Sequence, residues 1–395
     1  MVAIVTDIHY RMSLALLRDL GEAGVDIICC ESDRYRDSKA SPPLGALSRH
    51  CKRQVWLRDD DYLSALLELC REIGETYQCR PVLLPVGAAT LASVAAAREK
   101  FASVASLLIP TTEQLDLFNS KERLASLAQE LGVPVPESFV REAQESPEEF
   151  VRRLVYPCVI KPVCGEKHGL TAAQRYVFAN TEKESLAAYL KYQKLAGEDP
   201  VVQRRLMGGG LGLSVLAVNG TIVHSICHRR LREYPISGGP STCCRTEFRS
   251  DLLDYVKTLV SATGYSGLAM FEFKEDGNGK PYLLEVNPRI WGTFPLTRVS
   301  RSGIPLLWCT LAWNQGNPSD AVGVPAITEP TRCKMVFTAS DLMAAVKYLH
   351  GGHPQKSLEV MLDFFNPRVR DGVFEWKDMA PGAAYFRSLL AKEKH

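Results

Sequence analysis

The sequence has no long apolar run and no strong excess of charge of one sign. None of its apolar stretches reaches the roughly 18 residues that a membrane-spanning helix requires, so we do not expect an integral membrane protein. The formal net charge is only +2, which gives no reason to expect binding to nucleic acid or to an anionic membrane. The chain begins MVAIVT, without a basic segment followed by an apolar one. We therefore expect no secretory signal and a cytoplasmic location.

Several common nucleotide-binding and metal-binding motifs are also missing. No G-x-x-x-x-G-K-[ST] occurs, and the first strand-to-helix turn, TDIHYRM, lacks the G-x-G-x-x-G of a dinucleotide site. The 12 cysteines show no C-x-x-C spacing, which argues against a zinc or thioredoxin-like motif. His224 and His228 are four residues apart but lie in a predicted strand without an evident third ligand. We expect them to be structural or to line a substrate site rather than to bind zinc.

What is present first is an alternation of strand and helix patterns over about 110 residues, typical of a parallel α/β sheet. The predicted strands are residues 2–6, 25–30 and 82–86, and the predicted helices are residues 12–20, 62–73 and 88–98. A second region follows, with a helix at 121–131, strands at 156–161, 176–179 and 201–204, a helix at 182–195, a hairpin at 213–228 that turns at Asn219-Gly220, and a helix at 252–263. Beyond residue 318 the pattern becomes mixed and shorter.

The stretch GLAMFEFKEDGNGKPYLLEVNPRIWG, which begins at Gly267, predicts a β-hairpin. Asn278-Gly279 is the dipeptide preferred in two-residue type I′ turns, and such a turn would place Glu272 opposite Glu285. Strand alternation then puts both glutamates and Asn287 on one face. The opposite, apolar face would consist of Phe271, Phe273, Leu284 and Val286.

Two glutamates directly opposite each other destabilise a sheet by repulsion. Carboxylate and amide oxygens are the ligands that Mg²⁺ prefers, and Mg²⁺ commonly binds through one or two carboxylates together with substrate phosphates. The hairpin therefore predicts that Glu272, Glu285 and Asn287 bind Mg²⁺, with Mn²⁺ as an alternative, beside a nucleotide. A hairpin with one solvated polar face is the other interpretation.

Three further segments are candidates for binding anions or a base. Lys161 ends an apolar strand, and Gly165 and Gly169 would let the backbone of the next loop approach a phosphate, although a mobile surface loop is the alternative. The strand that contains Gln203, Arg204 and Leu206 could stack and read an adenine, or it could be an ordinary strand. Residues 228–247, rich in Arg, Gly, Pro and Ser, predict a long active-site loop.

The order of these segments resembles the ATP-grasp superfamily, in particular its carbamoyl-phosphate-synthase-like carboxylate–amine ligases. The resemblance runs from the N-terminus to about Asn314 and rests on NSKERLASLAQELGVPVPES, VIKP, VQRRLMGGGLGLSV, FEF and LLEVNPRIWG. It implies an α/β ATP-grasp fold with three parts. These are a Rossmann-like pre-ATP-grasp domain at residues 1–111, an ATP-grasp domain at 112–318 whose two subdomains hold nucleotide and Mg²⁺ between them, and a small C-terminal subdomain at 319–395.

The resemblance also implies roles for single residues. Nucleotide contacts would come from Lys121, Lys161, Gly165, Gly169, Gln203, Arg204 and Leu206, and metal ligands from Glu272, Glu285 and Asn287. Arg289 and Arg230 would act on the transferred phosphoryl group, and Arg229, Gly238, Gly239 and Ser241 on the substrate. Arg204 departs from the family, which often has an acidic residue there, and the phosphate loop has fewer glycines than in many relatives.

The implied activity is ATP- and Mg-dependent ligation. A carboxylate is activated as an acyl phosphate and joined to an amine, with release of ADP and phosphate. The expected substrates are small molecules, an amino acid or a short peptide, and a homodimer is an open alternative to a monomer. Two other functions stay open, namely bicarbonate activation as in the carboxylase branch of the superfamily, and nucleotide binding without turnover.

Overall fold

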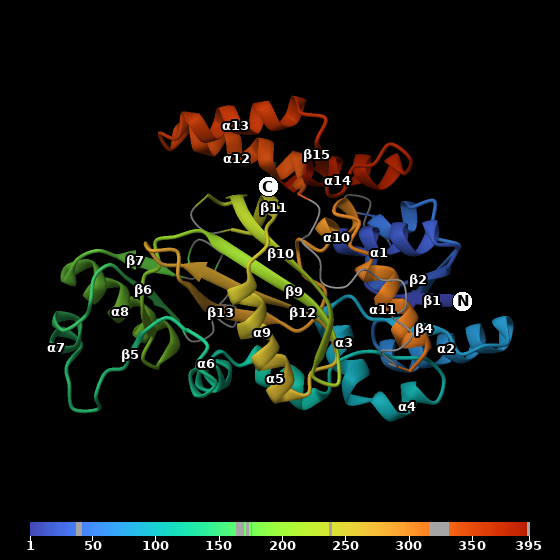
Figure 1. Cartoon of the computed structure of the whole chain (residues 1–395), viewed down its shortest axis with the longest axis horizontal. Helices are drawn as coiled ribbons and strands as arrows, with labels where there is room; N and C mark the ends of the chain where they lie inside the picture. Colours follow the sequence, from blue (N-terminus) through green and yellow to red (C-terminus); the bar gives the residue numbers. More distant parts are fainter. Residues whose placement is uncertain are drawn as a thin grey trace.

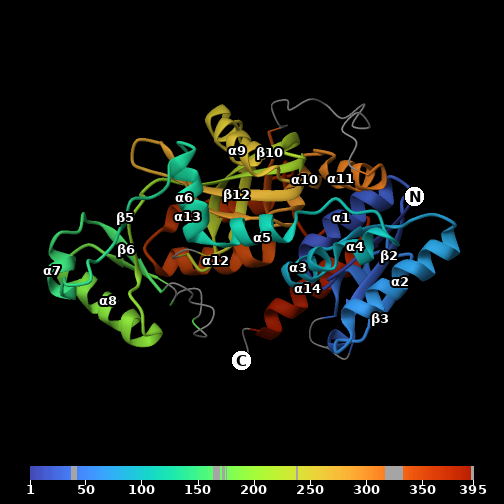
Figure 2. The same ribbon diagram turned by 90° about the horizontal axis from the view of Figure 1, so that it is seen from below.

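The computed structural model describes residues 1–36, 42–162, 170, 174, 176–236, 239–315 and 332–392. Three sheets form its framework. Figure 1 shows the N-terminal sheet and a small sheet at opposite ends of the molecule, with a seven-stranded sheet between them and the C-terminal helices along one side. Figure 2, turned by 90°, shows the same separation of the two ends.

The N-terminal sheet is parallel, with strand order β3-β2-β1-β4. Its elements are β1 (Val2–Val5), α1 (Arg11–Glu22), β2 (Asp26–Ser32), the 3₁₀ turns η1 (Asp33–Tyr35) and η2 (Leu44–Leu47), β3 (Arg53–Leu57), α2 (Tyr62–Tyr77), β4 (Val82–Leu84), α3 (Ala88–Ala96) and α4 (Arg98–Ala102). Every residue of β1 and β4 is buried, which explains their continuous apolar sequence. β3 escaped prediction because it is an edge strand whose first residue is exposed and polar.

The small sheet is antiparallel, with strand order β5-β8-β6-β7. Its strands are β5 (Ser138–Phe139), β6 (Cys158–Lys161), β7 (Val177–Ala179) and β8 (Val201–Arg204), and the helices α7 (Pro147–Arg152) and α8 (Glu182–Ala196) belong to the same unit. Phe150 of α7, Tyr189 and Tyr192 of α8, and Ile160 of β6 share its apolar core. This core is separate from that of the large sheet, so the small sheet is an independently packed unit.

The large sheet has strand order β13-β12-β9-β10-β11-β14-β15. Its strands are β9 (Gly210–Val218), β10 (Thr221–Glu233), β11 (Ser241–Thr246), β12 (Gly267–Glu275), β13 (Pro281–Asn287), β14 (Lys334–Val336) and β15 (Val369–Asp371). The helices α5 (Thr112–Asn119), α6 (Lys121–Glu130) and α9 (Ser250–Thr263) contribute to the core on one face. The predicted β9–β10 hairpin is present, and Asn219 (φ +47°) and Gly220 (φ +81°) form its two-residue turn.

The segment 228–247 is not the long loop that its composition predicted. β10 continues to Glu233 and pairs antiparallel with β11, so His228 lies opposite Thr246. The register of this pair shifts on both sides of Arg232, and the two strands are joined by the connection between Glu233 and Ser241. The hydrogen bonds between β10 and β11 and the buried side chains of β11 stabilise a strand here. The Gly, Pro and Ser residues indicate only the turn between the two strands.

The C-terminal part continues the large sheet. β14 pairs with β11 and β15 pairs with β14, and α10 (Pro295–Val299), α11 (Ile304–Trp313), α12 (Thr338–His350), α13 (Pro354–Phe365) and α14 (Met379–Lys392) complete the chain. The expected domain boundary at residue 318 lies outside the described residues. Among the described residues, no helix is both long and apolar enough to span a membrane.

Candidate active site

The β12–β13 hairpin has a longer turn than the predicted type I′ turn. The loop spans Asp276–Lys280 and is closed by the backbone N–H of its first residue, which donates to the carbonyl oxygen of its last (2.9 Å). Gly279 has a φ of +82°, but Asn278 is not among the described residues with positive φ. A type I′ turn needs positive φ at both central residues, so the predicted turn is wrong.

The predicted pairing of Glu272 with Glu285 is nevertheless confirmed. Next to the turn, Phe273 lies opposite Leu283, one residue out of the predicted register, and a bulge beyond Phe273 restores it. Leu283 accordingly packs in the apolar core, where Leu284 was expected. The longer turn shifts the register by one residue and the bulge shifts it back. Glu272 and Glu285 therefore lie opposite each other, as predicted.

The polar face of this hairpin carries balanced charges. Glu272 Oε2 accepts a hydrogen bond from Nη2 of Arg230 on β10 (2.7 Å), and the two side chains form an ion pair. Glu285 Oε1 accepts from Asn287 Nδ2 (3.4 Å), and Glu285 Oε2 lies 3.9 Å from Lys121 Nζ. The three residues predicted to bind a metal therefore lie together, with a cation beside each carboxylate.

The environment of Glu272 makes its carboxyl group harder to ionise than that of an exposed glutamate. Burial raises the pKa of Glu272, the Arg230 guanidinium lowers it, and the charge of Glu285 raises it again, with a net upward shift. Two carboxylates that disfavour each other's charge on a partly desolvated face form a place where positive charge is stabilising.

Both predicted nucleotide lysines reach this face from other elements. Lys161, at the end of β6, donates from Nζ to Gln203 Oε1 (2.8 Å). Burial lowers the pKa of Lys161 to about 8, with a further lowering by Lys121 and an opposing effect of Glu285. The small sheet, α6 and β13 thus bring Lys161, Lys121 and Glu285 within electrostatic range of one another. Residues more than 100 apart in sequence converge here, as the order of motifs predicted.

The predicted adenine strand is β8, which lies between β5 and β6. Gln203 Nε2 donates to Ser138 Oγ (3.0 Å), and the N–H of Arg204 donates to the carbonyl oxygen of Glu137 (2.9 Å). The side chain of Leu206, just beyond the strand, is buried. Gly165 and Gly169, predicted to cover the phosphates, lie outside the described residues.

The arginines of β10 differ in their surroundings. Arg229 is bound by two carboxylates: Glu247 accepts from Nε (2.6 Å) and Nη2 (2.7 Å), and Glu275 accepts from Nη1 (2.6 Å) and Nη2 (3.0 Å). These bonds raise the pKa of the guanidinium. Arg229 is engaged within the sheet, whereas Arg230 points to the metal face and contacts Glu272.

Gly238, Gly239 and Ser241, which were predicted to contact the substrate, lie between β10 and the start of β11. The N–H of Gly239 donates to the carbonyl oxygen of Pro235 (2.8 Å), and a Cβ there would fall 2.1 Å from the carbonyl oxygen of Tyr234. Ser241 is buried and its Oγ donates to the carbonyl oxygen of Cys243 (3.0 Å). Both residues are used by the turn itself, and Gly238 lies outside the described residues.

The two histidines of β10 are buried. His228 Nε2 lies 3.2 Å from Thr293 Oγ1, and burial lowers its pKa to about 3. Burial also lowers the pKa of His224, whose Nδ1 has no partner among the described residues. Both imidazoles are therefore neutral at physiological pH. No group of three His, Cys, Asp or Glu side chains within the described ranges is arranged to hold a metal.

Arg289 follows the metal strand, and its hydrogen bonds are to residues of the same segment. Its Nη2 donates to Asn287 Oδ1 (3.2 Å) and its Nη1 donates to the carbonyl oxygen of Ile290 (2.8 Å). Glu272 is paired with Arg230. The side chain of Arg289 is thus linked to a predicted metal ligand, and its Nε has no hydrogen-bond partner in the described part of the chain.

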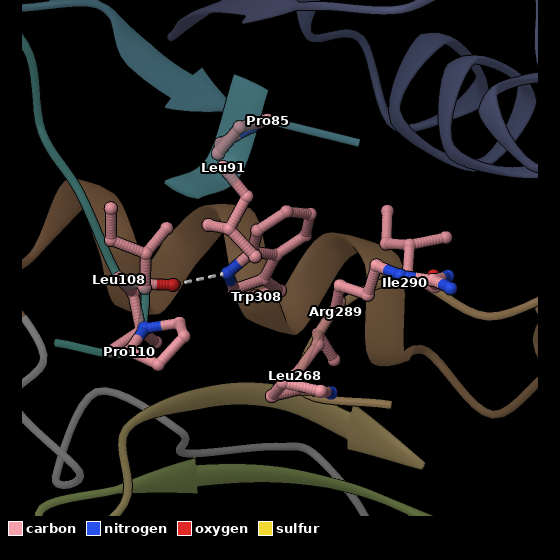
Figure 3. A pocket seen from close by; sticks show the side chains of 10 residues that line it. Pro85, Leu91, Leu108, Pro110, Leu268, Arg289, Ile290 and Trp308 are labelled. Carbon is pink, nitrogen blue, oxygen red and sulfur yellow. Dashed lines mark hydrogen bonds between the residues drawn. The ribbon is translucent and has the colours of Figure 1, made fainter. Parts of the chain in front are cut away.

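Figure 3 shows the crevice that Arg289 borders, between the N-terminal domain and the large sheet. Pro85 and Leu91 line it from the N-terminal domain, and Trp308 of α11 crosses between the two, donating from Nε1 to the carbonyl oxygen of Leu108 (2.8 Å). The crevice is apolar apart from Arg289. Apolar packing of this kind fixes the position of the arginine relative to the N-terminal domain.

The residues after β1 and β2 were not singled out from the sequence. His9, Tyr10 and Glu31 lie at the carboxyl ends of these parallel strands, and Tyr10 is within electrostatic range of Arg289. Ligands of open α/β sheets bind outside the carboxyl ends of the strands, at the point where the strand order reverses. The order reverses between β1 and β4, so that rule, applied to the predicted strands 2–6 and 82–86, would have pointed to the loop after β1 that carries His9 and Tyr10.

Comparison with known proteins agrees with this architecture. A family model described as ATP-grasp in the biosynthetic pathway with Ter operon matches residues 198–336. The carbamoyl phosphate synthase large chain of Archaeoglobus fulgidus is 26% identical over 245 residues, 59% of this chain and 22% of that protein. Its counterpart from Xylella fastidiosa is 27% identical over 256 residues, 61% of this chain and 23% of that protein. The chain thus spans less than a quarter of the length of these relatives.

Solved structures share the fold over most of the chain. The biotin carboxylase of Campylobacter jejuni, in complex with β-γ-ATP, superposes with a TM-score of 0.60 at 16% identity, covering 83% of this chain and 73% of that chain. The L-amino acid ligase of Bacillus licheniformis superposes with a TM-score of 0.54 at 18% identity, covering 82% and 77%. The predicted α/β ATP-grasp fold is confirmed by these solved structures, and within it residues 198–336 match an ATP-grasp family model.

Proposed function

We propose that the protein is an ATP- and Mg-dependent ligase that activates a carboxylate as an acyl phosphate and joins it to an amine. ADP and phosphate are the other products. One observation carries the proposal: two lysines from different elements, Lys121 and Lys161, converge on the paired carboxylates Glu272 and Glu285. Cations for phosphates and acidic ligands for a metal are what a site for a metal–nucleotide complex needs.

The donor set fits Mg²⁺. Glu272, Glu285 and Asn287 offer two carboxylates and one amide oxygen, and burial, together with the charge of Glu285, raises the pKa of Glu272. When bound, Mg²⁺ would neutralise charge on the phosphates of ATP. Mn²⁺ takes the same oxygen ligands and is the alternative ion.

The chain's own residues would act mainly by positioning and charge. Lys161 and Lys121 bind phosphate oxygens of ATP, and the carboxylate oxygen of the substrate attacks the γ-phosphorus, so that ADP leaves. Arg289 and Arg230 hold oxygens of the carboxylate and of the transferred phosphoryl group through their planar guanidinium groups. The amine then attacks the acyl carbon, and the bond to phosphate breaks. No covalent enzyme intermediate is required.

The two other candidates lack a specific observation in their favour. The fold is similar both to a biotin carboxylase (TM-score 0.60) and to an amino acid ligase (TM-score 0.54), and a shared fold by itself does not identify the substrate. Nucleotide binding without turnover would not require the whole set of acidic, amide and arginine side chains on one face. We therefore retain carboxylate–amine ligation, with an amino acid or a short peptide as the expected substrate class.

A screen of ADP release tests the proposal. The protein is incubated with ATP and Mg²⁺ and with the 20 proteinogenic L-amino acids singly and in pairs, and with bicarbonate plus biotin as a separate arm. We expect steady ADP and phosphate release with at least one pair, above the rate without substrate. Release that requires bicarbonate would favour the carboxylase alternative. Tight nucleotide binding without turnover in every arm would favour the non-catalytic one.

A further inference from the structure

The loop after β1 lies against the segment that follows the metal strand. Asp7 Oδ2 accepts from the N–H of Gly87 (2.8 Å), which ties the ends of β1 and β4 together. Pro85, just after β4, lines the same crevice as Arg289 (Figure 3). Arg11 Nη2 lies 3.9 Å from the point where a Cβ on Gly292 would stand. The carboxyl ends of the N-terminal strands therefore face the end of the proposed active site.

His9 in this loop is held by a buried carboxylate. Glu31 Oε2 accepts two hydrogen bonds from His9, one from the backbone N–H (2.8 Å) and one from Nδ1 (2.8 Å), and Glu31 Oε1 accepts from the N–H of Ser32 (3.0 Å). Glu31 is only 1% exposed. With Nδ1 engaged by Glu31, Nε2 is the ring nitrogen that is left to contact a substrate. Nε2 has no partner among the residues that the structure describes.

Aromatic rings fix the plane of the imidazole. The ring of Tyr35 is stacked on His9, with centroids 4.2 Å apart, and the ring of Tyr10 lies 4.0 Å away on a tilt. Burial raises the pKa of the Tyr10 hydroxyl and the charge of Arg289 lowers it, which places the two side chains within electrostatic range. His9 is thus a ring held in a fixed orientation, in contact with Tyr10, which is itself within electrostatic range of the arginine proposed to hold the reacting carboxylate.

We propose that His9, oriented by Glu31, is the general base that accepts a proton from the amine substrate. The inference rests on the proposed function, because an amine that is protonated at neutral pH must lose a proton before it can attack an acyl phosphate. A neutral imidazole whose other nitrogen is held by a carboxylate is the usual arrangement of a side-chain base. On the metal-binding face, the imidazole of His228 is buried and lies against Thr293, and Lys161 donates to Gln203, so neither is free in the way that His9 Nε2 is.

The proton and electron balance is as follows. His9 Nε2 takes one proton from R–NH₃⁺, which leaves R–NH₂ and an imidazolium paired with Glu31. The nitrogen lone pair forms the C–N bond to the acyl carbon, and the C–O bond to the phosphoryl group breaks with its electron pair on the departing phosphate. The second proton that the nitrogen loses passes to that phosphate. No oxidant or reductant is involved.

The test compares two nucleophiles in wild-type protein and in His9→Asn. Asparagine can still donate to Glu31 but has no titratable lone pair. With amino acids as the carboxylate, hydroxylamine serves as a nucleophile that is largely uncharged at neutral pH and needs no base, whereas a second amino acid is an ammonium ion. The wild-type protein must form hydroxamate in an ATP-dependent way, which tests the proposed function by itself. His350→Asn, at an exposed histidine of α12, is the matched control.

For His9→Asn we expect ligation of the amino acid pair at pH 7 to fall about 100-fold, while hydroxamate formation stays within about threefold of wild type. The deficit should shrink as the pH rises, because solution then supplies the free amine. Glu31→Gln should lose about tenfold with the same selectivity, which keeps the test valid if His9→Asn folds poorly. The groups that could contribute to the profile are Glu31, Tyr10 and Tyr35, which contact His9, and Asp7 and Arg289, which act on Tyr10.

Equal loss with both nucleophiles would make His9 a structural residue and overturn the inference. Unchanged activity with both would overturn it as well. If the wild-type protein forms neither hydroxamate nor ADP with any amino acid, the proposed function fails and the inference fails with it. That result is separate from the others because it precedes any variant.

Discussion

Among single residues, the two paired carboxylates differ in how firmly they are held. Glu272 makes a 2.7 Å ion pair with a partly buried arginine, whereas Glu285 has a 3.9 Å contact with Lys121, whose side chain is 60% exposed. Exposed ion pairs contribute only about 0–1 kcal/mol to stability. Removing the Glu285 side chain should therefore cost the fold little stability. Its position opposite Glu272, however, makes it central to the proposed metal site.

Glu285→Ala should abolish turnover without unfolding the protein. Removing one of two facing carboxylates relieves repulsion of about 0.2–1 kcal/mol, so we expect the free energy of unfolding to hold or to rise slightly. ADP release should fall about 100-fold or more. Urea denaturation and the ADP assay measure the two effects. Glu122→Ala removes an exposed charge next to Lys121 and should change neither. ADP release at the wild-type rate would refute the metal assignment.

Lys161 gives a prediction about pH. Its folded pKa of about 8 lies below the value of about 10.4 for an unfolded lysine. The unfolded state therefore binds more protons between these values, and the cost of burying the charge, present below about pH 8, is relieved as the pH rises to about 10.4.

Lys161→Met should consequently be more stable than wild type by about 1–2 kcal/mol at pH 7, with a gain that fades by about pH 10.5. Its affinity for ATP should fall, because a phosphate ligand is lost. Urea denaturation at the two pH values and calorimetry with ATP measure these effects. Lys257→Met, at an exposed lysine of α9, should show no such pH dependence. A variant that is less stable than wild type at pH 7 would count against burial as the cause of the shift.

At the scale of elements, the hairpin shows what residue counting can and cannot deliver. Asn278-Gly279 located the turn to within two residues, and the predicted pairing of Glu272 with Glu285 was right. The turn type and the bulge could not be foreseen, because they depend on where Leu283 finds space in the core. The pairing survived because both strands must keep their apolar residues on one side.

The β10–β11 connection shows the opposite case. The Arg, Gly, Pro and Ser content of this segment favoured a loop. In the structure β11 instead pairs with β14, which lies almost 90 residues further along the chain. Pairing over such a distance leaves little trace in local composition. For the same reason the ion pairs of Arg229 could not be predicted from the sequence. The spacing of the motifs that contain Glu272, Glu285, Lys121 and Lys161, in contrast, could be read directly from it.

A packing test at this scale concerns Gly212 of β9. A Cβ there would lie 2.3 Å from Cε1 of His228, a fully enclosed ring on the next strand. Gly212→Ala should therefore lower the free energy of unfolding by about 1–3 kcal/mol. Gly277→Ala is the control, since its Cβ would have no neighbour within 4 Å, and thermal denaturation compares the two. Equal stability of both variants would contradict the packing described for His228.

Across the whole molecule, buried ion pairs join the C-terminal segment to the rest. Arg232 of β10 is bound by Asp341 and Asp363, and Arg18 of α1 is bound by Asp378 (2.9 Å). One apolar core also contains residues of β1, α1, α10, α11 and β14. The mixed pattern after residue 318 gave no sign of this attachment, because the partners of the acidic residues are 100 to 360 positions away.

Asp378→Asn tests the attachment through its pH dependence. Burial by itself would raise the pKa of Asp378, but hydrogen bonds from the Arg49 N–H, Arg18 and Ser48 hold it below its usual value. A depressed carboxyl pKa contributes stability above the unfolded pKa of about 3.9, and this stability is lost as the pH falls through the folded pKa.

We expect Asp378→Asn to lose about 2–4 kcal/mol at pH 7, with a smaller difference from wild type below about pH 3.5. Thermal denaturation at both pH values measures this. Asp254→Asn, at an exposed aspartate of α9, should be neutral throughout. A loss for Asp378→Asn that is independent of pH would show that packing, not the charge, holds the C-terminal segment.

The most direct test of carboxylate activation follows the oxygen atom. A carboxylate substrate found in the ADP-release screen is labelled with ¹⁸O in both carboxyl oxygens, and the products formed with its amine partner are examined by ³¹P NMR and mass spectrometry. An acyl phosphate intermediate predicts one ¹⁸O in each inorganic phosphate formed, one ¹⁸O retained in the new amide, and ADP as the nucleotide product. Unlabelled phosphate, or AMP formed in proportion to product, would contradict the account.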